Sequence, residues 1–154
     1  MYRKMNPDTT LHEIVTPSVP LYFQASEVAK IMGCESGWVA RLGQIIAPEI
    51  AANGKGYRAA YSFRNLVEMR IVEEMIKFGV PRKRIASYLI TLRASTINVF
   101  SDTQEEAWIV IDGEWRWQIA NTFTAIRLGW QNHIPDSLLA ISIGKIKKEL
   151  KNQL

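Results

Sequence analysis

The stretch NGKGYRAAYS, residues 53–62, decides the fold that this sequence predicts. Its Asn53-Gly54 pair is a strong turn signal, because both residue types tolerate a positive φ. We therefore expect a β-hairpin over residues 45–61, in which IIAPEI and YRAAY form the strands and AANGKG forms the tip. The stretch is basic and glycine-rich and contains no acid. The hairpin is thus suited to contact with a negatively charged partner.

Two short helices are predicted before the hairpin. Residues 25–33, ASEVAKIMG, have an apolar face, with Ser26 as the N-cap and Gly33 as the stop. After a tight turn, SGWVARLGQ forms a second helix, which Ser36 caps. Two short helices separated by a brief turn that contains glycine are the pattern of a helix-turn-helix.

Two longer helices are predicted after the hairpin. Residues 62–78 have an amphipathic pattern, with Ser62 as the N-cap and Gly79 at the end. Pro81 then begins a helix with the sequence PRKRIASYLITLR, where its missing N–H is harmless in the first turn. The order of elements to this point is helix, turn, helix, hairpin, helix, helix.

The rest of the chain predicts a small second domain. Residues 108–119, WIVIDGEWRWQI, are rich in aromatic and β-branched residues and contain an Asp-Gly turn signal, so they predict another hairpin. Residues 120–129 are predicted to be helical, 138–143 to form a strand and 144–154 to form a basic helix. This part of the chain therefore has the order β-β-α-β-α.

Four tryptophans gather in this second part: Trp108, Trp115, Trp117 and Trp130. Tryptophan buries a large area and is enriched in interfaces and ligand pockets. Three interpretations are open: the core of a small sheet, a pocket for an unidentified small-molecule effector, or a dimer interface. A domain of roughly 50 residues buries little surface by itself. This favours the core and also makes dimerisation through residues 138–143 and the last helix attractive.

The composition is that of a globular protein. Of 154 residues, 47% are hydrophobic and 22% are charged. No apolar run of about 18 residues is present, and the N-terminus has no apolar signal core, so we expect a soluble, cytoplasmic protein with no membrane contact. The single cysteine, Cys34, and the distant His12 and His133 do not make a metal site. With no phosphate loop and no paired His–carboxylate motif, we expect neither a cofactor nor catalysis.

Charge is unevenly distributed around the net value of +4. Residues 1–93 contain 13 Lys and Arg against 8 Asp and Glu, residues 94–136 contain 2 against 6, and residues 137–154 contain 4 against 1. The first half is therefore basic and the middle acidic. This asymmetry indicates that the first half contacts a polyanion.

The ordered set of motifs resembles the N-terminal DNA-binding domain of the MerR family of transcriptional regulators. The resemblance covers about residues 22–93 and is carried by ASEVAKIMGC, by GYR and YS within GYRAAYS, by the apolar helix that follows and by FGVPRKRIASYL. It implies a winged helix-turn-helix whose wing ends in the GYR and YS elements. The expected fold class is thus α+β, mainly α, with an arm over 1–20, the DNA-binding domain over 21–93, a linker over 94–106 and a small α/β domain over 107–154.

The resemblance makes Ser36 to Leu42 the recognition helix and places Arg41 on its DNA side. An arginine there is suited to a bidentate pair with guanine in the major groove. The alternative for Arg41 is an ordinary solvated surface arginine. Trp38, on the same helix, is either a base contact or a residue packed in the core or hinge.

The resemblance also places Lys55, Tyr57 and Arg58 on the wing and Tyr61 on its return strand. Lys55 and Arg58 would bind phosphates or enter the flanking minor groove, which adds affinity but little sequence information. A plain exposed loop is the alternative for both. Tyr57 and Tyr61 would brace the wing, each with a hydroxyl free for a phosphate.

Helix starts supply further anion sites. Backbone N–H groups near Ser26 and near Ser62 are available to a phosphate. Arg64 lies in the first turn of a helix, where a cation opposes the helix dipole, and this is explained if a phosphate lies between the two. The basic cluster at 82–84 is either a solvated helix face or one more contact with the DNA backbone.

These features predict a sequence-specific transcriptional regulator that binds double-stranded DNA as a homodimer, because short recognition helices usually act in pairs. Two alternatives stay open. One is an excisionase-like architectural protein of mobile DNA, which bends its site. The other is a winged-helix protein-interaction module that docks on an acidic partner and does not bind DNA. A steep salt dependence of duplex binding distinguishes a DNA binder from the interaction module.

Overall fold

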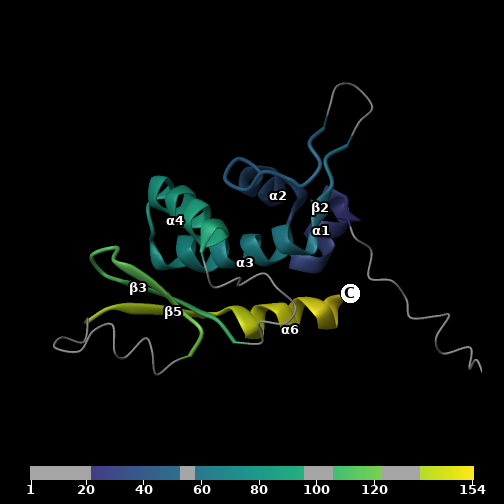
Figure 1. Cartoon of the computed structure of the whole chain (residues 1–154). Coiled ribbons are helices and arrows are strands. Elements are labelled where there is room, and N and C mark those ends of the chain that lie inside the picture. The colour runs from purple at the N-terminus through teal and green to yellow at the C-terminus, as the bar shows by residue number, and fades with distance from the viewer. Residues whose placement is uncertain (1–21, 53–57, 96–105, 123–135) are drawn as a thin grey trace, which may run out of the picture.

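The structure is a computed structural model that describes residues 22–52, 58–95, 106–122 and 136–154. Within these ranges the chain is a mixed α/β protein with five helices and two small antiparallel sheets (Figure 1). The helices are α1 (Ala25–Met32), α2 (Ser36–Leu42), α3 (Phe63–Phe78), α4 (Arg82–Ala94) and α6 (Ile143–Gln153). The strands are β1 (Tyr22–Phe23), β2 (Tyr61–Ser62), β3 (Trp108–Asp112), β4 (Trp117–Ala120) and β5 (Leu138–Ser142).

Helix α3 lies at the centre of the molecule, with α2 on one side and α6 on the other (Figure 1). Its fully buried residues include Leu66, Met69, Ile71 and Met75, which do not fall on a single stripe. The sequence predicted a helix with one apolar face. The structure differs because α1, α4, β5 and α6 all contact α3, so that most of its circumference is covered.

Several helix ends follow local sequence signals. Gly33 and Gly79 end α1 and α3 with φ values of 66° and 94°. This left-handed conformation is one that glycine adopts without strain. Ser62 caps α3 as expected, because its hydroxyl accepts a hydrogen bond from the N–H of Asn65 at 3.3 Å.

The caps predicted for α1 and α2 are wrong. Gln24, rather than Ser26, is the N-cap residue of α1, and its N–H donates to the carboxylate of Glu27 at 2.7 Å. Helix α2 begins at Ser36 itself, and Glu35 is the N-cap residue. Both serines therefore lie within the first turn of their helices, where they are exposed.

The segment 45–61 differs from the predicted hairpin in its first arm. Ile50 and Ala60 form an antiparallel bridge with backbone hydrogen bonds of 3.0 and 2.9 Å, whereas most of the predicted tip lies outside the described residues. Strand β2 pairs with β1 rather than with the first arm. The reason is that the chain continues to turn after α2: the N–H of Ile46 bonds to the carbonyl of Leu42 at 2.8 Å, and Ile46 is fully buried.

Strands β3, β4 and β5 form one antiparallel sheet in the order β4-β3-β5. This confirms the predicted hairpin with its Asp-Gly turn and the predicted strand before the last helix. One face of the sheet carries Ile109, Ile111 and Ile141, which join the main core. Of the helix predicted over 120–129, residues 123–129 lie outside the described residues, and its first residue, Ala120, belongs to β4 instead.

An aromatic cluster docks this sheet on the helices. The Tyr88 hydroxyl of α4 donates to the carbonyl of Trp115 at 2.5 Å, and the Tyr88 ring packs on Trp117 with centroids 4.8 Å apart. The Trp115 ring meets Phe78 edge-on at 6.2 Å. These two tryptophans therefore pack between the helices and the sheet, and one cluster of buried side chains extends through both. Trp130 lies outside the described residues.

A buried carboxylate holds the turn between β3 and β4. Asp112 is 1% exposed and accepts hydrogen bonds from the N–H of Glu114 at 2.9 Å and from the N–H and Nε of Arg116 at 2.9 and 2.7 Å. Burial by itself favours the neutral acid, but these bonds and the Arg116 charge outweigh it. They hold the pKa of Asp112 below its ordinary value of 3.8.

We expect the stability that Asp112 contributes to be fully present above about pH 4 and to be lost as the pH falls through the lowered pKa. Asp112→Asn should therefore lower the free energy of unfolding by about 1–3 kcal/mol at pH 7 and by much less at about pH 2. Urea unfolding of both proteins at the two pH values measures this. Glu114→Gln, at an exposed carboxylate of the same turn, is the control. An equal loss at both pH values would contradict the role of the ionised carboxylate.

Among the described helices, none has the length and apolar character that a membrane span requires. The described residues also contain no group of three or more His, Cys, Asp or Glu side chains placed to hold a metal ion. Cys34 is half-buried, and its burial, reinforced by the nearby Glu73 carboxylate, raises the pKa of its thiol.

Candidate nucleic-acid interface

Helix α2 presents a basic residue on a face of small side chains. Val39 and Leu42 are buried in the core, whereas Gly37, Ala40 and Arg41 are exposed. A Cβ placed on Gly37 would meet no atom within 4 Å, so no described part of the protein crowds this face. Such a helix can approach another surface closely, with Arg41 as its one long exposed side chain.

The Arg41 side chain rests on Trp38, and α3 holds Trp38 in place. The Arg41 guanidinium lies over the Trp38 ring, 5.2 Å from its centroid, and its Nε donates to the carbonyl of Gly37 at 3.4 Å. The Trp38 indole N–H donates to one oxygen of Glu73 at 3.0 Å, and Arg70 donates to the other at 3.1 Å. These contacts fix α2 on α3 and define the position of Arg41.

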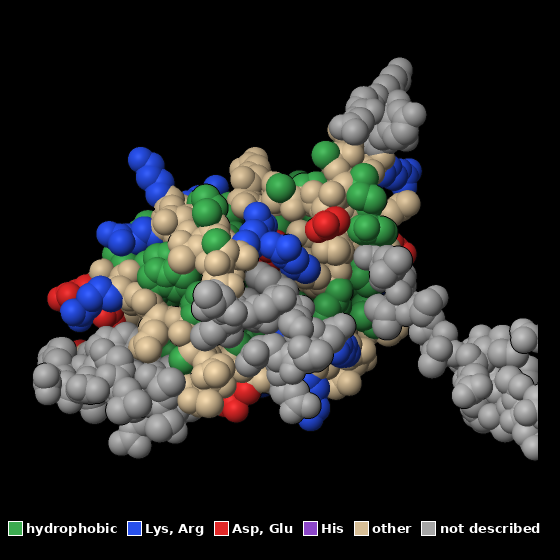
Figure 2. Space-filling model, in the orientation of Figure 1, with side chains coloured by type: hydrophobic (Ala, Val, Ile, Leu, Met, Phe, Trp, Pro, Cys, Tyr) green, Lys and Arg blue, Asp and Glu red, His purple; other side chains and the backbone are tan. Residues whose placement is uncertain are grey.

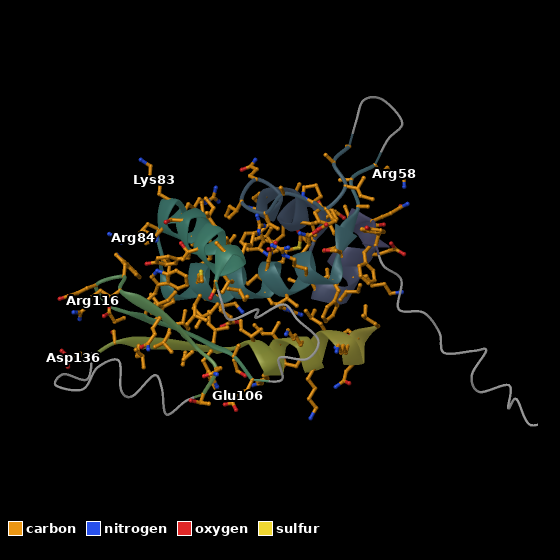
Figure 3. All side chains as sticks on the ribbon, in the orientation of Figure 1. Arg58, Lys83, Arg84, Glu106, Arg116 and Asp136 are labelled. Atoms are coloured by element: carbon orange, nitrogen blue, oxygen red, sulfur yellow. The ribbon has the colours of Figure 1, made fainter. Side chains whose placement is uncertain are left out.

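Arg58 lies on the return side of the predicted wing and is exposed. Its guanidinium donates to the side chain of Gln24 at 3.1 Å, which ties it to the start of α1. Figure 3 shows Arg58 on the upper side of the molecule, the side of α3 on which α2 lies, whereas the three-stranded sheet and α6 lie below α3. Lys55 and Tyr57 lie outside the described residues.

Tyr61 differs from its expected role. Its side chain is 6% exposed and belongs to the main core. Its hydroxyl lies 3.4 Å from the position that a Cβ on Gly43 would take. The ring is thus part of the core, and its burial leaves it little surface on which to meet a phosphate. Sequence alone placed Tyr61 on a strand without deciding which face of that strand is buried.

The helix starts that were expected to bind anions already hold protein groups. At α1, the carboxylate of Glu27 accepts a hydrogen bond from the backbone N–H of Gln24, two residues before Ser26. At α3, Ser62 and Asn65 each accept a hydrogen bond from the backbone N–H of the other. This reciprocal arrangement is a capping box, which satisfies two of the N–H groups that a phosphate would need.

Beneath the interface, a buried carboxylate binds three side chains. Glu68 of α3 is fully buried. It accepts hydrogen bonds from Nε and Nη2 of Arg93 at 2.7 and 2.8 Å, from Arg64 at 3.3 Å and from the Asn65 amide at 3.3 Å. The hydrogen bonds to Glu68 raise the pKa of Arg93 above its ordinary value. Arg64, which was expected to face a phosphate, is thus explained by an ion pair within the protein.

Asn65 connects this carboxylate to the segment before the predicted wing. Its side chain is buried, and its oxygen accepts from the N–H of Glu49 and the N–H of Ser62, both at 3.0 Å. Its nitrogen donates to the carbonyl of Ala47 at 3.2 Å and to Glu68. One side chain therefore joins the chain that enters the wing, the start of α3 and, through Glu68, helix α4.

These supporting residues were not predicted from the sequence, although a signal was present. Glu68 and Glu73 both interrupt the apolar stretch LVEMRIVEEM. An acid on a helix that is covered on most sides needs a partner, because an unpaired buried charge is strongly unfavourable. The signal becomes readable only when the helix is known to be covered.

Three further basic side chains lie at the start of α4. Arg82, Lys83 and Arg84 are exposed, and the first turn of α4 has no acid. Lys83, like Arg58, projects from the upper side in Figure 3, and Figure 2 shows basic side chains at the upper left and upper right of this face. Cations at a helix start are unfavourable to the helix dipole. An anion bound there would interact favourably with the basic side chains and with the dipole.

The chemistry of this side of the molecule suits binding to phosphates and to base edges. Arginine offers a planar fork of donors that matches a phosphate or a guanine edge. Glu68 and Glu73, the buried acids of α3, are paired within the protein. Neither a scan against protein-family models nor a search of curated proteins finds a match to this chain.

Proposed function

We propose that this chain is a sequence-specific transcriptional regulator of the MerR-like type, which binds duplex DNA as a homodimer. In this proposal α1 and α2 form the helix-turn-helix, α2 enters the major groove, and the chain between Ile50 and Ala60 forms the wing. One observation carries the proposal. A short helix that exposes small side chains and Arg41 lies on the same side of α3 as the exposed Arg58 (Figures 1 and 3).

In this proposal Arg41 reads sequence. The small residues Gly37 and Ala40 let the backbone of α2 come close to the base edges, and Arg41 then pairs with guanine through two hydrogen bonds. Stacking on Trp38 limits the guanidinium to few orientations, so less rotamer freedom is lost on binding. A pair of this kind is worth about 1–3 kcal/mol of discrimination against other bases.

Arg58 and the basic start of α4 have a different role in this proposal. They meet phosphates on either side of the groove that α2 enters. Such contacts release condensed counterions and add affinity for any sequence. The tie between Arg58 and Gln24 supports this role, because it keeps the guanidinium close to α1 without covering it.

The test is binding to a pool of random duplexes, followed by affinity measurements on selected sites at several salt concentrations. Arg41→Ala should relax preference at one base pair, by about 1–3 kcal/mol. Arg58→Ala should weaken all sites alike and lower the slope of log affinity against log salt by about 1. Lys148→Ala, which removes an exposed cation of α6 on the other side of α3, is the matched control and should change neither quantity.

Three outcomes would contradict the proposal. If the Arg41 and Arg58 variants changed sequence preference and salt dependence alike, the two arginines would not have the separate roles of base recognition and phosphate binding. Absence of duplex affinity even at low salt would favour the protein-interaction module. Strong bending of the bound duplex with no sequence preference would favour the architectural protein.

A further inference from the structure

Strand β5 is one of the two outer strands of the three-stranded sheet, and no described strand pairs with its far edge. The N–H of Ile143 donates to the carbonyl of Ala107. These two residues are therefore a hydrogen-bonded pair, next to the Trp108–Ser142 pair at the end of the β3–β5 ladder. Because hydrogen-bonded pairs alternate along an antiparallel ladder, the backbone groups that point away from β3 belong to Leu138, Ala140 and Ser142. Leu138 is 42% exposed. An edge of this kind is a template for another strand.

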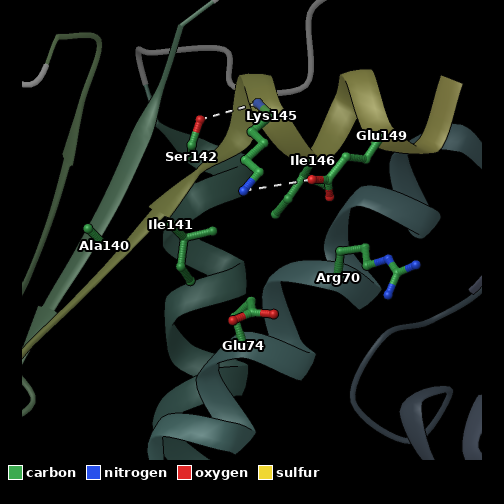
Figure 4. Close-up of a pocket in the computed structure, with 8 residues that line it drawn as sticks. All are labelled: Arg70, Glu74, Ala140, Ile141, Ser142, Lys145, Ile146 and Glu149. Atoms are coloured by element: carbon green, nitrogen blue, oxygen red, sulfur yellow. Dashed lines mark hydrogen bonds and ion pairs between the residues drawn. The ribbon is translucent and has the colours of Figure 1, made fainter. Parts of the chain in front are cut away.

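A groove runs along this edge between α3 and α6 (Figure 4). Its rims carry charges of both signs, with Arg70 and Glu74 on α3 and Lys145 and Glu149 on α6. Among the described residues, the ion pairs of these four side chains stay within their own helices, so none closes the groove. Its volume of about 290 Å³ is at the lower limit for small-molecule sites, roughly 300 Å³. A strand is therefore a better occupant than a small ligand.

We infer that the β5 edge pairs with the same edge of a second copy of the chain and joins two sheets into one of six strands. The choice of occupant rests on the proposed function, which requires two copies on one DNA site. The edge is also self-complementary, because the outward N–H and C=O groups of Ala140 meet the same groups of a copy that runs antiparallel. Full antiparallel overlap of Leu138–Ser142 places Ala140 opposite Ala140 of the second copy, on the two-fold axis.

The pairing of residue 140 with itself can be tested with opposite charges. Ala140→Lys and Ala140→Glu each place like charges face to face, and each should raise the dimer dissociation constant by up to about fivefold. An equimolar mixture of the two variants should dimerise again as a mixed pair. Sedimentation velocity over a concentration series, with one variant fluorescently labelled, measures both effects. Ile90→Lys adds the same charge at a 68%-exposed site on α4 and should dimerise like the wild type.

A second variant separates loss of the dimer from loss of the fold. Ala140→Pro removes an N–H that points outward, and an edge strand tolerates this change. Circular dichroism and Tm should therefore stay close to the wild type, while the dimer weakens about tenfold or more. A wild-type monomer at every concentration, or a mixture no better than the single variants, would overturn the inference. Monomers that bind duplex DNA would keep the DNA-binding part of the proposed function and remove its homodimer, whereas a β5-edge dimer without duplex affinity would remove that function and keep the interface.

Discussion

Replacing Arg93 with methionine is expected to lower the free energy of unfolding by about 3 kcal/mol. Methionine keeps most of the length of the side chain, so the main loss is the bidentate bond to Glu68. The Glu68 side chain is 0% exposed. Without Arg93, its partners among the described residues would be Arg64 and Asn65. A buried charge deprived of its main partner is among the most destabilising single changes in a protein.

The opposite deletion should be milder. Glu68→Gln removes the buried charge and leaves Arg93, whose side chain is 33% exposed and can turn to water. We expect a loss of about 1–2 kcal/mol. Urea unfolding of both variants measures the difference, and Arg84→Met, at an exposed arginine of the same helix, should change stability by no more than about 0.5 kcal/mol. If Glu68→Gln lowered the free energy of unfolding more than Arg93→Met does, an unpaired Glu68 charge would not be the cause of the destabilisation.

Asn65→Ala is expected to lower the free energy of unfolding by about 2–4 kcal/mol, because one substitution removes four hydrogen-bond partners. The N–H of Glu49 and the carbonyl of Ala47 would lose their bonds to α3. The segment that leads into the predicted wing would then be held mainly by its bridge between Ile50 and Ala60. If that segment positions Arg58, affinity for duplex DNA should fall as well, even at temperatures where the variant is fully folded.

Ser62→Ala is the matched control for this prediction. It removes one acceptor from the same capping box and should lower stability by about 1 kcal/mol. Chemical unfolding and a gel-shift titration of both variants at one salt concentration give the two readouts. If Asn65→Ala were no worse than Ser62→Ala, the bonds to Ala47 and Glu49 would contribute little to stability.

Local chemistry accounts for the elements that could be predicted. Gly33 and Gly79 end helices because the backbone there needs a positive φ, and Ser62 begins one because a hydroxyl can accept from a free N–H. Asp112 holds the β3–β4 turn through its side chain, which accepts from the N–H groups of Glu114 and Arg116, although the residue with a positive φ there is Trp115 rather than Gly113. Each of these choices depends on a few neighbouring residues, so it is readable from the order of the amino acids.

The supporting network could not be predicted, because its members act over long sequence distances. Trp38 bonds to Glu73, Asn65 to Ala47, and Arg93 to Glu68, with the partners separated by 35, 18 and 25 positions. Nothing near Arg64 in the sequence shows that the carboxylate one turn later is buried. For that reason Arg64 was assigned to a phosphate, although it pairs within the protein.

The sequence by itself determined where most of the chain turns and stops, which segments are helical, and that basic residues concentrate in the first half. Tertiary structure decided which of those residues remain available to a partner. Packing on opposite sides of α3 buried Tyr61 and Glu68, engaged Arg64 and Arg93 in ion pairs, and left Arg41 and Arg58 exposed. The physical reason is that capping and turn formation depend on adjacent residues, whereas burial and charge pairing depend on which distant segments meet.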